Sequence, residues 1–360
     1  MFVAWREMRG ATTRFVLVGV VVALITGLVT FLSGLIGGLV QQNISAITDL
    51  PADRIVFGVP AGGNRSFEDS TVTARQADAW AQAPGVERVD AVGIGQTRLV
   101  LGDAQQSVTV FGSDLYRQYL PAGQDREDLA GAVVVPRGLA EELRADAGDR
   151  VLMGGRPHRV VVSDATQWYS HMPVVWTSLE TWRDLGGTSE AVAPFATVLA
   201  VSGSGIDVEA ADAAAGTEST TVRGSLSALA SFTSEVGSLL LMVGLLFAIS
   251  ALVIGAFFNI WSMQRRGDVA VLRALGATTR RLMTDALGQA LVLLVGGVVV
   301  GLALASSGAL LASAGLPYVF SPLTTLAPAA ITIALGLLGA AVATRSVTRI
   351  DPLVALGSNR

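Results

Sequence analysis

The sequence predicts an integral membrane protein with four transmembrane α-helices and a large α+β extracytoplasmic domain between helices 1 and 2. Its 360 residues are 51% hydrophobic and only 15% charged, with a mean hydropathy of +0.55. Soluble domains have about 25% charged residues, so this composition indicates a protein that spans lipid. The apolar residues gather in long uncharged runs, and a charged stretch, residues 41–230, separates the first run from the others.

Three runs without a charged residue define the spans. They cover residues 15–40, 236–264 and 286–344. About 20 apolar residues cross the hydrocarbon core, so the first two runs hold one span each and the third holds two. The third run is divided by residues that cannot continue a helix or that favour turns, namely Gly315, Pro317, Pro322 and Pro328. The predicted spans are 15–40, 231–263, 284–312 and 325–344.

Positive charge predicts the orientation, because short cytosolic segments are enriched in Arg and Lys. The basic residues lie before span one, between spans two and three, and after span four: Arg6, Arg9, Arg14, Arg265, Arg266, Arg273, Arg280, Arg281, Arg345, Arg349 and Arg360. We therefore expect a cytosolic amphipathic N-terminal segment (1–14), a cytosolic segment at 264–283 and a cytosolic tail (345–360). Residues 41–230 and the uncharged loop 313–324 are expected outside.

The outer segment is predicted to be a folded α+β domain. It carries 14 Arg against 24 Asp and Glu, so nucleic acid is not an expected partner. The chain has no cysteine, so packing alone must stabilise the domain. Strand-like patterns occur at 107–111, 132–135, 159–162 and 197–201, and helix-like patterns at 73–83 and 137–144. The Ala-rich stretch 208–216 fits either a short helix or a loop.

Residue types used in catalysis are scarce. The chain has no lysine, and a P-loop ATPase needs one to reach the β and γ phosphates. With two histidines, no cysteine and no H-E-x-x-H pair, neither a metal site nor a His-based triad is expected. We expect a non-catalytic subunit without an intrinsic cofactor, with ATP and Mg bound by a separate chain. The absence of lysine also suggests a high-GC bacterial genome.

Segment 264–283 combines arginines with an apolar helical face between two spans. Arginines alone would fit a role in setting topology. The apolar face is not needed for topology, and it favours contact with a cytosolic partner. The residues expected to make this contact are Arg265, Arg266, Asp268, Val271, Leu272, Leu275 and Gly276.

One span, a large outer domain and three further spans resemble the permease subunit of the MacB/FtsX-like class of ABC transporters. Residues 265–277 are similar to that family's coupling motif, with Asp268 where Glu is more usual. Residues 348–356 resemble its C-terminal end, and 148–151 followed by 160–162 resemble a strand pair of its outer domain. The resemblance implies a homodimer in a bacterial plasma membrane, bound to two copies of a separate ABC ATPase subunit. It also implies mechanotransmission, in which ATP-driven helix motion reaches the outer domain.

Span one carries a stripe of small residues on one helical face, spaced three or four apart. The stripe comprises Gly19, Ala23, Gly27, Thr30, Gly34 and Gly38. Small residues let helices approach closely in lipid, so we expect a packing seam. The partner is either span two of the same chain or the second copy, and we favour the dimer seam.

A narrower resemblance suggests the cargo. Residues 1–9 and 168–176 look like the HrtB and DevC branch of the family, which is associated with haem efflux and glycolipid export. Haem needs an apolar slot and an axial ligand such as His, Met or Tyr, and a carboxylate also suits ferric iron. The candidates are Glu235, Met242, Tyr169, His171 and Met172. Each also has a structural explanation: an acid near a helix start is stabilised by the helix dipole, and Met and His usually pack or hydrogen-bond.

The leading prediction is therefore the permease subunit of an ATP-driven ABC exporter that removes haem from the membrane. Export of another lipid-like or peptide substrate by the same machinery is one alternative. The other is FtsX-like regulation of a cell-wall hydrolase through the outer domain, without transport.

Overall fold

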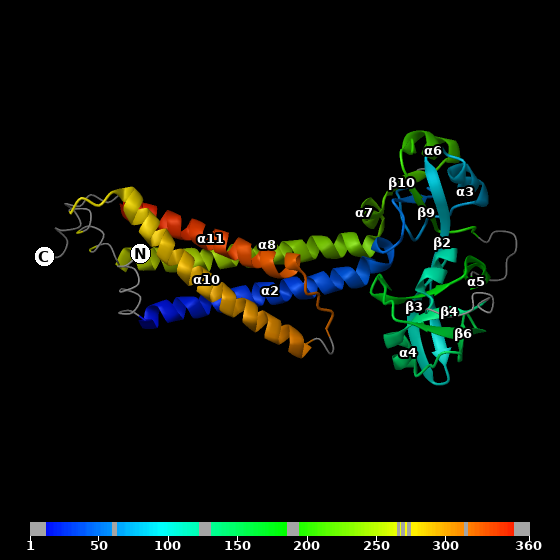
Figure 1. Cartoon of the computed structure of the whole chain (residues 1–360), viewed down its shortest axis with the longest axis horizontal. Helices are drawn as coiled ribbons and strands as arrows, with labels where there is room; N and C mark the ends of the chain where they lie inside the picture. The colour runs from blue at the N-terminus through cyan, green and yellow to red at the C-terminus, as the bar shows by residue number, and fades with distance from the viewer. Residues whose placement is uncertain are drawn as a thin grey trace. The chain divides into compact units, whose positions relative to one another are not determined.

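The computed structural model describes residues 12–59, 63–121, 131–185, 194–264, 267, 271, 275–312 and 316–348. The chain forms two compact units. One, the membrane unit, holds Met1–Leu39 and Ser238–Arg360, and the other, the α+β domain, holds Val40–Gly237. Two long helices, α2 (Thr12–Thr48) and α8 (Ala230–Gln264), each have residues in both units (Figure 1).

Among the described residues, four helices are long and apolar enough to cross a membrane, which confirms the four predicted spans. They are α2, α8, α10 (Thr279–Ala312) and α11 (Pro322–Thr348). Helix α2 continues to Thr48, beyond the predicted end of the span at residue 40. Residues 41–50 mix polar and apolar side chains and include no Gly or Pro, so nothing local stops the helix at the end of the hydrophobic run.

Helix α11 begins at Pro322, since proline suits the first helical position. The Ser321 hydroxyl caps this end by accepting the Thr324 N–H at 3.1 Å. Pro328 was grouped with the turn from the sequence, but it lies inside α11. Thr332 Oγ1 donates to the Pro328 carbonyl at 2.9 Å.

The α+β domain is built on a ten-stranded sheet among the described residues. The strands are β1 (Arg54–Phe57), β2 (Val86–Leu101), β3 (Ala104–Gly112), β4 (Val133–Pro136), β5 (Arg150–Met153), β6 (Arg156–Ser163), β7 (Trp168–Tyr169), β8 (Met172–Thr177), β9 (Val198–Gly203) and β10 (Glu218–Thr221). The helices and 3₁₀ turns are α3 (Ala74–Ala81), η1 (Asp114–Tyr119), α4 (Arg137–Leu143), α5 (Leu179–Leu185), α6 (Val208–Ala215), α7 (Val222–Ser225) and η3 (Leu226–Ala228). Every strand and helix predicted for this region is present, and the Ala-rich stretch is a helix.

Strand β2 belongs to two lobes of the domain. Its first part pairs with β9, in the order β10-β1-β9-β2. Its second part pairs with β3, and the order continues β8-β4-β6-β5. Strand β5 pairs back onto β2 at Leu99 and Val100, which closes the second lobe on itself. A closed sheet leaves no free edge, so a small apolar core can be fully enclosed.

Each lobe has its own apolar core. In the first, helices α3 and α6 lie side by side against the sheet and bury Trp80 with Val56 and Leu199 (Figure 1). In the second, Leu99, Val110 and other inward-facing strand residues pack with α4. A third cluster joins residues near the end of α2 to Phe57, Phe111 and Trp176. The last residues of α2 are therefore part of the core of the α+β domain.

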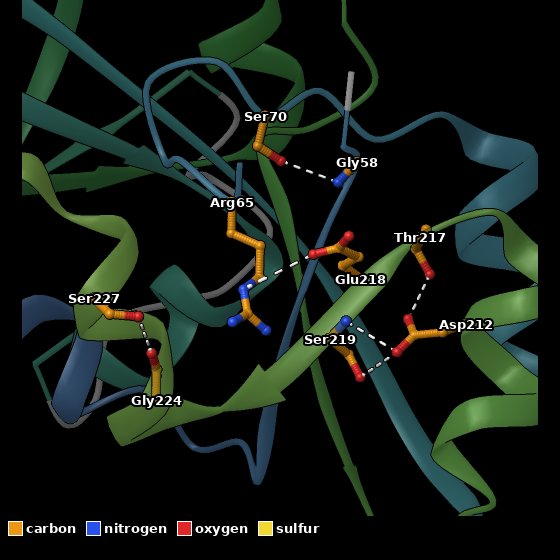
Figure 2. Close-up of polar contacts among 9 residues, drawn as sticks. All are labelled: Gly58, Arg65, Ser70, Asp212, Thr217, Glu218, Ser219, Gly224 and Ser227. Atoms are coloured by element: carbon orange, nitrogen blue, oxygen red, sulfur yellow. Dashed lines mark hydrogen bonds and ion pairs between the residues drawn. The ribbon is translucent and has the colours of Figure 1, made fainter. Parts of the chain in front are cut away.

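Polar contacts hold strand β10, which leads toward α8 (Figure 2). The Asp212 carboxylate accepts hydrogen bonds from Thr217 Oγ1 at 2.8 Å, from the Ser219 N–H at 3.0 Å and from Ser219 Oγ at 2.8 Å. Arg65 lies 3.9 Å from the Glu218 carboxylate, an exposed ion pair that contributes little. The Asp212 contacts tie β10 to α6, so the chain enters α8 from a fixed position.

Candidate functional site, a polar clasp at the ends of the first two spans

Five polar residues meet where the ends of α2 and α8 lie in the α+β domain. Asn43 lies near the end of α2, Ser231 and Glu235 in the first turns of α8, and Ser170 and His171 at the tip of the β7–β8 hairpin. We call these five residues the polar clasp. All of them belong to the α+β domain. The clasp links three segments that are far apart in the sequence.

The hairpin tip has an unusual backbone. Tyr169 pairs with Met172, which leaves Ser170 and His171 as the two central residues, with φ of 50° and 61°. Two-residue hairpins need left-handed conformations there, and Asn-Gly is the usual solution. Side chains at both positions make this turn less favourable, so surrounding contacts must hold it. The Ser170 N–H donates to the Asn43 carbonyl at 2.9 Å, and the His171 N–H donates to the Gln42 carbonyl at 3.1 Å.

The side chains of the clasp form a connected hydrogen-bond network. Asn43 is fully buried; its Nδ2 donates to Glu235 Oε2 at 2.7 Å, and its Oδ1 accepts from Ser231 Oγ at 2.9 Å. His171 Nε2 lies 2.8 Å from the same Glu235 Oε2. Ser170 Oγ donates to Ser231 Oγ at 3.3 Å. Because Asn43 is buried, water cannot readily replace its amide. Removing the amide would therefore leave Glu235 and Ser231 without these hydrogen bonds.

Glu235 uses only one of its two carboxylate oxygens in this network. Oε2 receives both Asn43 and His171, whereas no bond to Oε1 is found within the described ranges. The side chain is 23% exposed, so it is reachable from outside the protein. A carboxylate held by two donors with one oxygen left over can take a further cationic ligand. The His171 side chain is 39% exposed.

The structure separates the other predicted haem ligands. Tyr169 is buried, and its ring packs edge-on against Phe67 and Phe111, with centroids 6.1 and 5.7 Å away. Burial raises the pKa of Tyr169 well above its ordinary value, so the phenol stays neutral and is a weak ligand. This position argues against a ligand role for Tyr169. Met172 is half-buried beside the hairpin tip, and Met242 lies on α8 in the membrane unit with an exposed side chain.

Only part of the predicted coupling segment is described. The side chains of Val271 and Leu275 are exposed, as a docking face requires, and Gly276 has a φ of 91°, which favours glycine. Arg265, Arg266, Asp268 and Leu272 lie outside the described residues. The contact of this segment with a cytosolic partner stays a prediction.

The stripe of small residues in α2 packs within the chain, against α10 and the segment that precedes α11. A Cβ added to Gly301 of α10 would lie 2.6 Å from the Ala23 carbonyl and 3.0 Å from the Gly27 nitrogen. A side chain at Gly34 would overlap Tyr318, and one at Gly38 would overlap the Pro317 carbonyl. Thr30, also in the stripe, is buried, whereas space is open at Gly19 itself. The partner of this seam is thus the third span rather than the second, and the contacts do not favour a dimer seam.

Sequence reasoning missed three of the five clasp residues. Asn43, Ser170 and Ser231 are small polar residues of common type, and no spacing connects them along the chain. Within the part of the chain that the structure describes, no group of three His, Cys, Asp or Glu could hold a metal ion.

Comparison with protein families gives two adjoining matches. Residues 16–218 match the MacB-like periplasmic core domain, and residues 240–352 match the FtsX-like permease C-terminal domain. The chain belongs to this family of FtsX-like permeases. It is a permease of the MacB/FtsX type of ABC transporter, a transport subunit in a bacterial cell membrane whose family implies a partner ATPase.

Several full-length relatives are known. A protein of Staphylococcus haemolyticus (strain JCSC1435), named "Putative hemin transport system permease protein HrtB", is 24% identical over 364 residues, covering 99% of each chain. A protein of Mycobacterium bovis (strain ATCC BAA-935 / AF2122/97), named "Uncharacterized ABC transporter permease Mb2592", is 25% identical and also covers 99% of each chain. The crystal structure of the periplasmic region of MacB from Actinobacillus actinomycetemcomitans aligns with 50% of this chain and 95% of that chain, with 14% identity and a TM-score of 0.37.

Proposed function

We propose that this permease exports haem from the membrane, with Glu235 as the residue that receives the iron. Full-length relatives named as hemin transport permeases support the cargo. The observation that carries the site is the Glu235 carboxylate, which is fixed by Asn43 and His171 through Oε2 and has Oε1 to spare. An oxygen ligand suits ferric haem.

His171 is the second residue of this proposal. Its Nε2 already bonds Glu235 Oε2, so ligation of iron by the imidazole competes with this bond, whereas ligation by Glu235 Oε1 leaves it in place. A haem held by both residues would therefore break this link of the clasp. Cargo binding and the state of the clasp are then coupled, because the cargo binds more tightly to the open arrangement.

The clasp also supports mechanotransmission. Helices α2 and α8 have 37 and 35 residues, so at 1.5 Å per residue each is a rod about 50 to 55 Å long. A closed clasp makes the ends of the two rods move together with the β7–β8 hairpin. ATP and Mg bound by two copies of the partner ATPase would supply the motion at the cytosolic segment that contains Val271 and Leu275.

The experiment is a haem titration of the full chain in nanodiscs, followed by the Soret band. We expect saturable binding to the native protein and about tenfold weaker binding for Glu235→Gln, which keeps the shape and removes the charge. Glu209→Gln is the matched control, since it removes an exposed acid elsewhere on the same domain. His171→Ala should change the Soret maximum if the imidazole contacts iron.

Two results would contradict the proposal. Non-saturable partitioning of haem, equal to that of empty nanodiscs, would remove haem as cargo and favour another amphiphile or a regulated protein partner. Saturable binding that is equal for Glu235→Gln and Glu209→Gln would keep haem but remove the clasp as its site.

A further inference from the structure

A second site lies on the α+β domain, away from the clasp. A pocket of about 280 Å³ is formed between β2, β3 and α5. Its lining includes Gln96, Thr97, Val110, Trp182, Arg183 and Leu185. Val110, Trp182 and Leu185 contribute apolar surface, and Gln96, Thr97 and Arg183 contribute hydrogen-bond donors. The volume is slightly below the usual range for drug-sized ligands, about 300–1,000 Å³, so a ligand of one or two rings fits.

Glycines of β2 and β3 make room for the Trp182 indole beside this site. Gly93 and Gly112 face each other across β2 and β3, and a Cβ at either position would overlap Trp182. A Cβ at Gly95 would lie 3.1 Å from the indole nitrogen. The strands therefore have no side chains where Trp182 lies. This arrangement fixes the indole as one wall of the pocket.

Arg183 brings a positive charge to the same pocket. Its Nε donates to the Phe195 carbonyl at 2.9 Å, and its guanidinium carbon lies 4.3 Å from the centre of the Phe195 ring. Among the described residues, the buried Nη2 has no hydrogen-bond partner and Arg183 forms no ion pair. The indole N–H of Trp182 also makes no hydrogen bond within these residues, but it is not buried as Nη2 is.

Donors without acceptors in a partly buried place are costly, and native proteins seldom keep them without a reason. Here the buried and charged Nη2 of Arg183 is left over, and none of the described lining residues is an acid. A ligand that supplies acceptor oxygens and a negative charge would satisfy this donor and would also accept from the indole N–H of Trp182. A flat apolar body would lie between Trp182 and the side chains of Val110 and Leu185.

We propose that this pocket binds a small organic carboxylate with a flat apolar body, the carboxylate on Arg183 and the ring system against Trp182. The proposal is independent of haem export, because it shares no residue with the clasp. It assigns to the α+β domain a ligand site of its own.

The test uses 2-naphthoate as the probe and the full chain in nanodiscs, with equilibrium dialysis read by naphthoate fluorescence. Empty nanodiscs give the background from partitioning into lipid. We expect saturable binding of 2-naphthoate and at least tenfold weaker binding of 2-naphthamide, which lacks the charge. Arg183→Gln should weaken naphthoate binding to a similar extent. Arg137→Gln is the matched control, since that arginine is exposed and pairs with Asp164 instead.

Trp182→Phe provides a second variant if Arg183→Gln fails to fold. It keeps an aromatic wall and removes the indole N–H, so binding should weaken by a smaller factor than for Arg183→Gln. The proposal is overturned if naphthoate binding does not saturate, if the amide binds equally well, or if Arg183→Gln and Arg137→Gln bind the probe with the same affinity.

Discussion

Helices α2 and α8 have nearly the same mean hydropathy in their most apolar stretches, 2.8 and 2.7, yet they are used differently. In α2, 39% of that stretch is buried within the chain, against 11% in α8. Helix α2 packs closely against α10 through small residues such as Gly27. Helix α8 buries Ser250, Ile254 and Phe258 but no residue from Ser238 to Ile249. Hydropathy alone therefore does not reveal what a span packs against.

The contrast bears on how two copies would meet. Lipid tails are as apolar as leucine, so association between membrane helices depends on which faces remain open. Small residues of α2 already pack against α10. In the first half of α8, by contrast, the side chains of Leu241, Leu245 and Ile249 are exposed. We therefore expect the second copy of the proposed homodimer to pack on the first half of α8.

Gly301→Ala should have the largest effect on stability, because Gly301 lies in the close contact between α10 and α2. The new methyl would meet the Ala23 carbonyl, which is backbone and yields little. Overpacking of this kind costs about 1–3 kcal/mol. Gly296→Ala is the control on the same helix, since nothing lies within 4 Å of its added Cβ. Thermal unfolding in detergent should show a lower Tm for Gly301→Ala alone. Equal Tm values would mean that α2 and α10 are not closely packed.

Asn43→Ala should have the second-largest effect on stability, because it removes hydrogen bonds between α2 and α8. Its loss leaves the Ser231 hydroxyl without an acceptor and Glu235 with one donor fewer; because both partners are only partly buried, the cost should lie near the lower end of about 1–3 kcal/mol. Hydrogen exchange of the Ser170 and His171 amides should become faster. Thr48→Ala is the control, since its hydroxyl bonds only carbonyls of its own helix. If exchange at the hairpin tip is unchanged in Asn43→Ala, the clasp does not hold the turn.

Leu241→Cys should have the smallest effect on stability, within about 0.5 kcal/mol, because the side chain is exposed. The native chain has no cysteine, so oxidation of membrane vesicles reports only the new thiol. We expect a disulfide-linked dimer on non-reducing gels. Ala23→Cys, buried against α10, should give none. A disulfide-linked dimer of Ala23→Cys, with none of Leu241→Cys, would mean that α2 and not α8 forms the dimer interface.

Much of the architecture could be predicted from local properties. Uncharged runs gave the number of spans, because a span is a matter of length and apolarity. Predicted strands such as 132–135 and 197–201 are present because β-branched residues between turn residues favour strands regardless of their partners. The long strand β2 was not predicted, since its glycines and charged residues weaken the strand pattern; Trp182 needs those glycines.

The candidate site was predictable only in part. Glu235 was predicted as the only acid at the outer end of span two, and His171 as a possible axial ligand in the stretch 168–176; the structure brings these two within 2.8 Å. Tyr169 drew equal attention, but it belongs to the aromatic core, because adjacent residues of a hairpin point to opposite faces. Asn43 carries no sequence signal, since its role depends on partners 188 and 192 residues away.

The sequence by itself determined the class of protein, the four spans and the α+β domain between the first two, because length, apolarity and charge act locally. Only the tertiary structure decided which faces of the helices pack against other parts of the chain. The stripe in α2 packs on α10, the first half of α8 stays open, and the clasp joins three distant segments. These outcomes depend on contacts between residues far apart in the chain, and short-range patterns carry no information about such pairs.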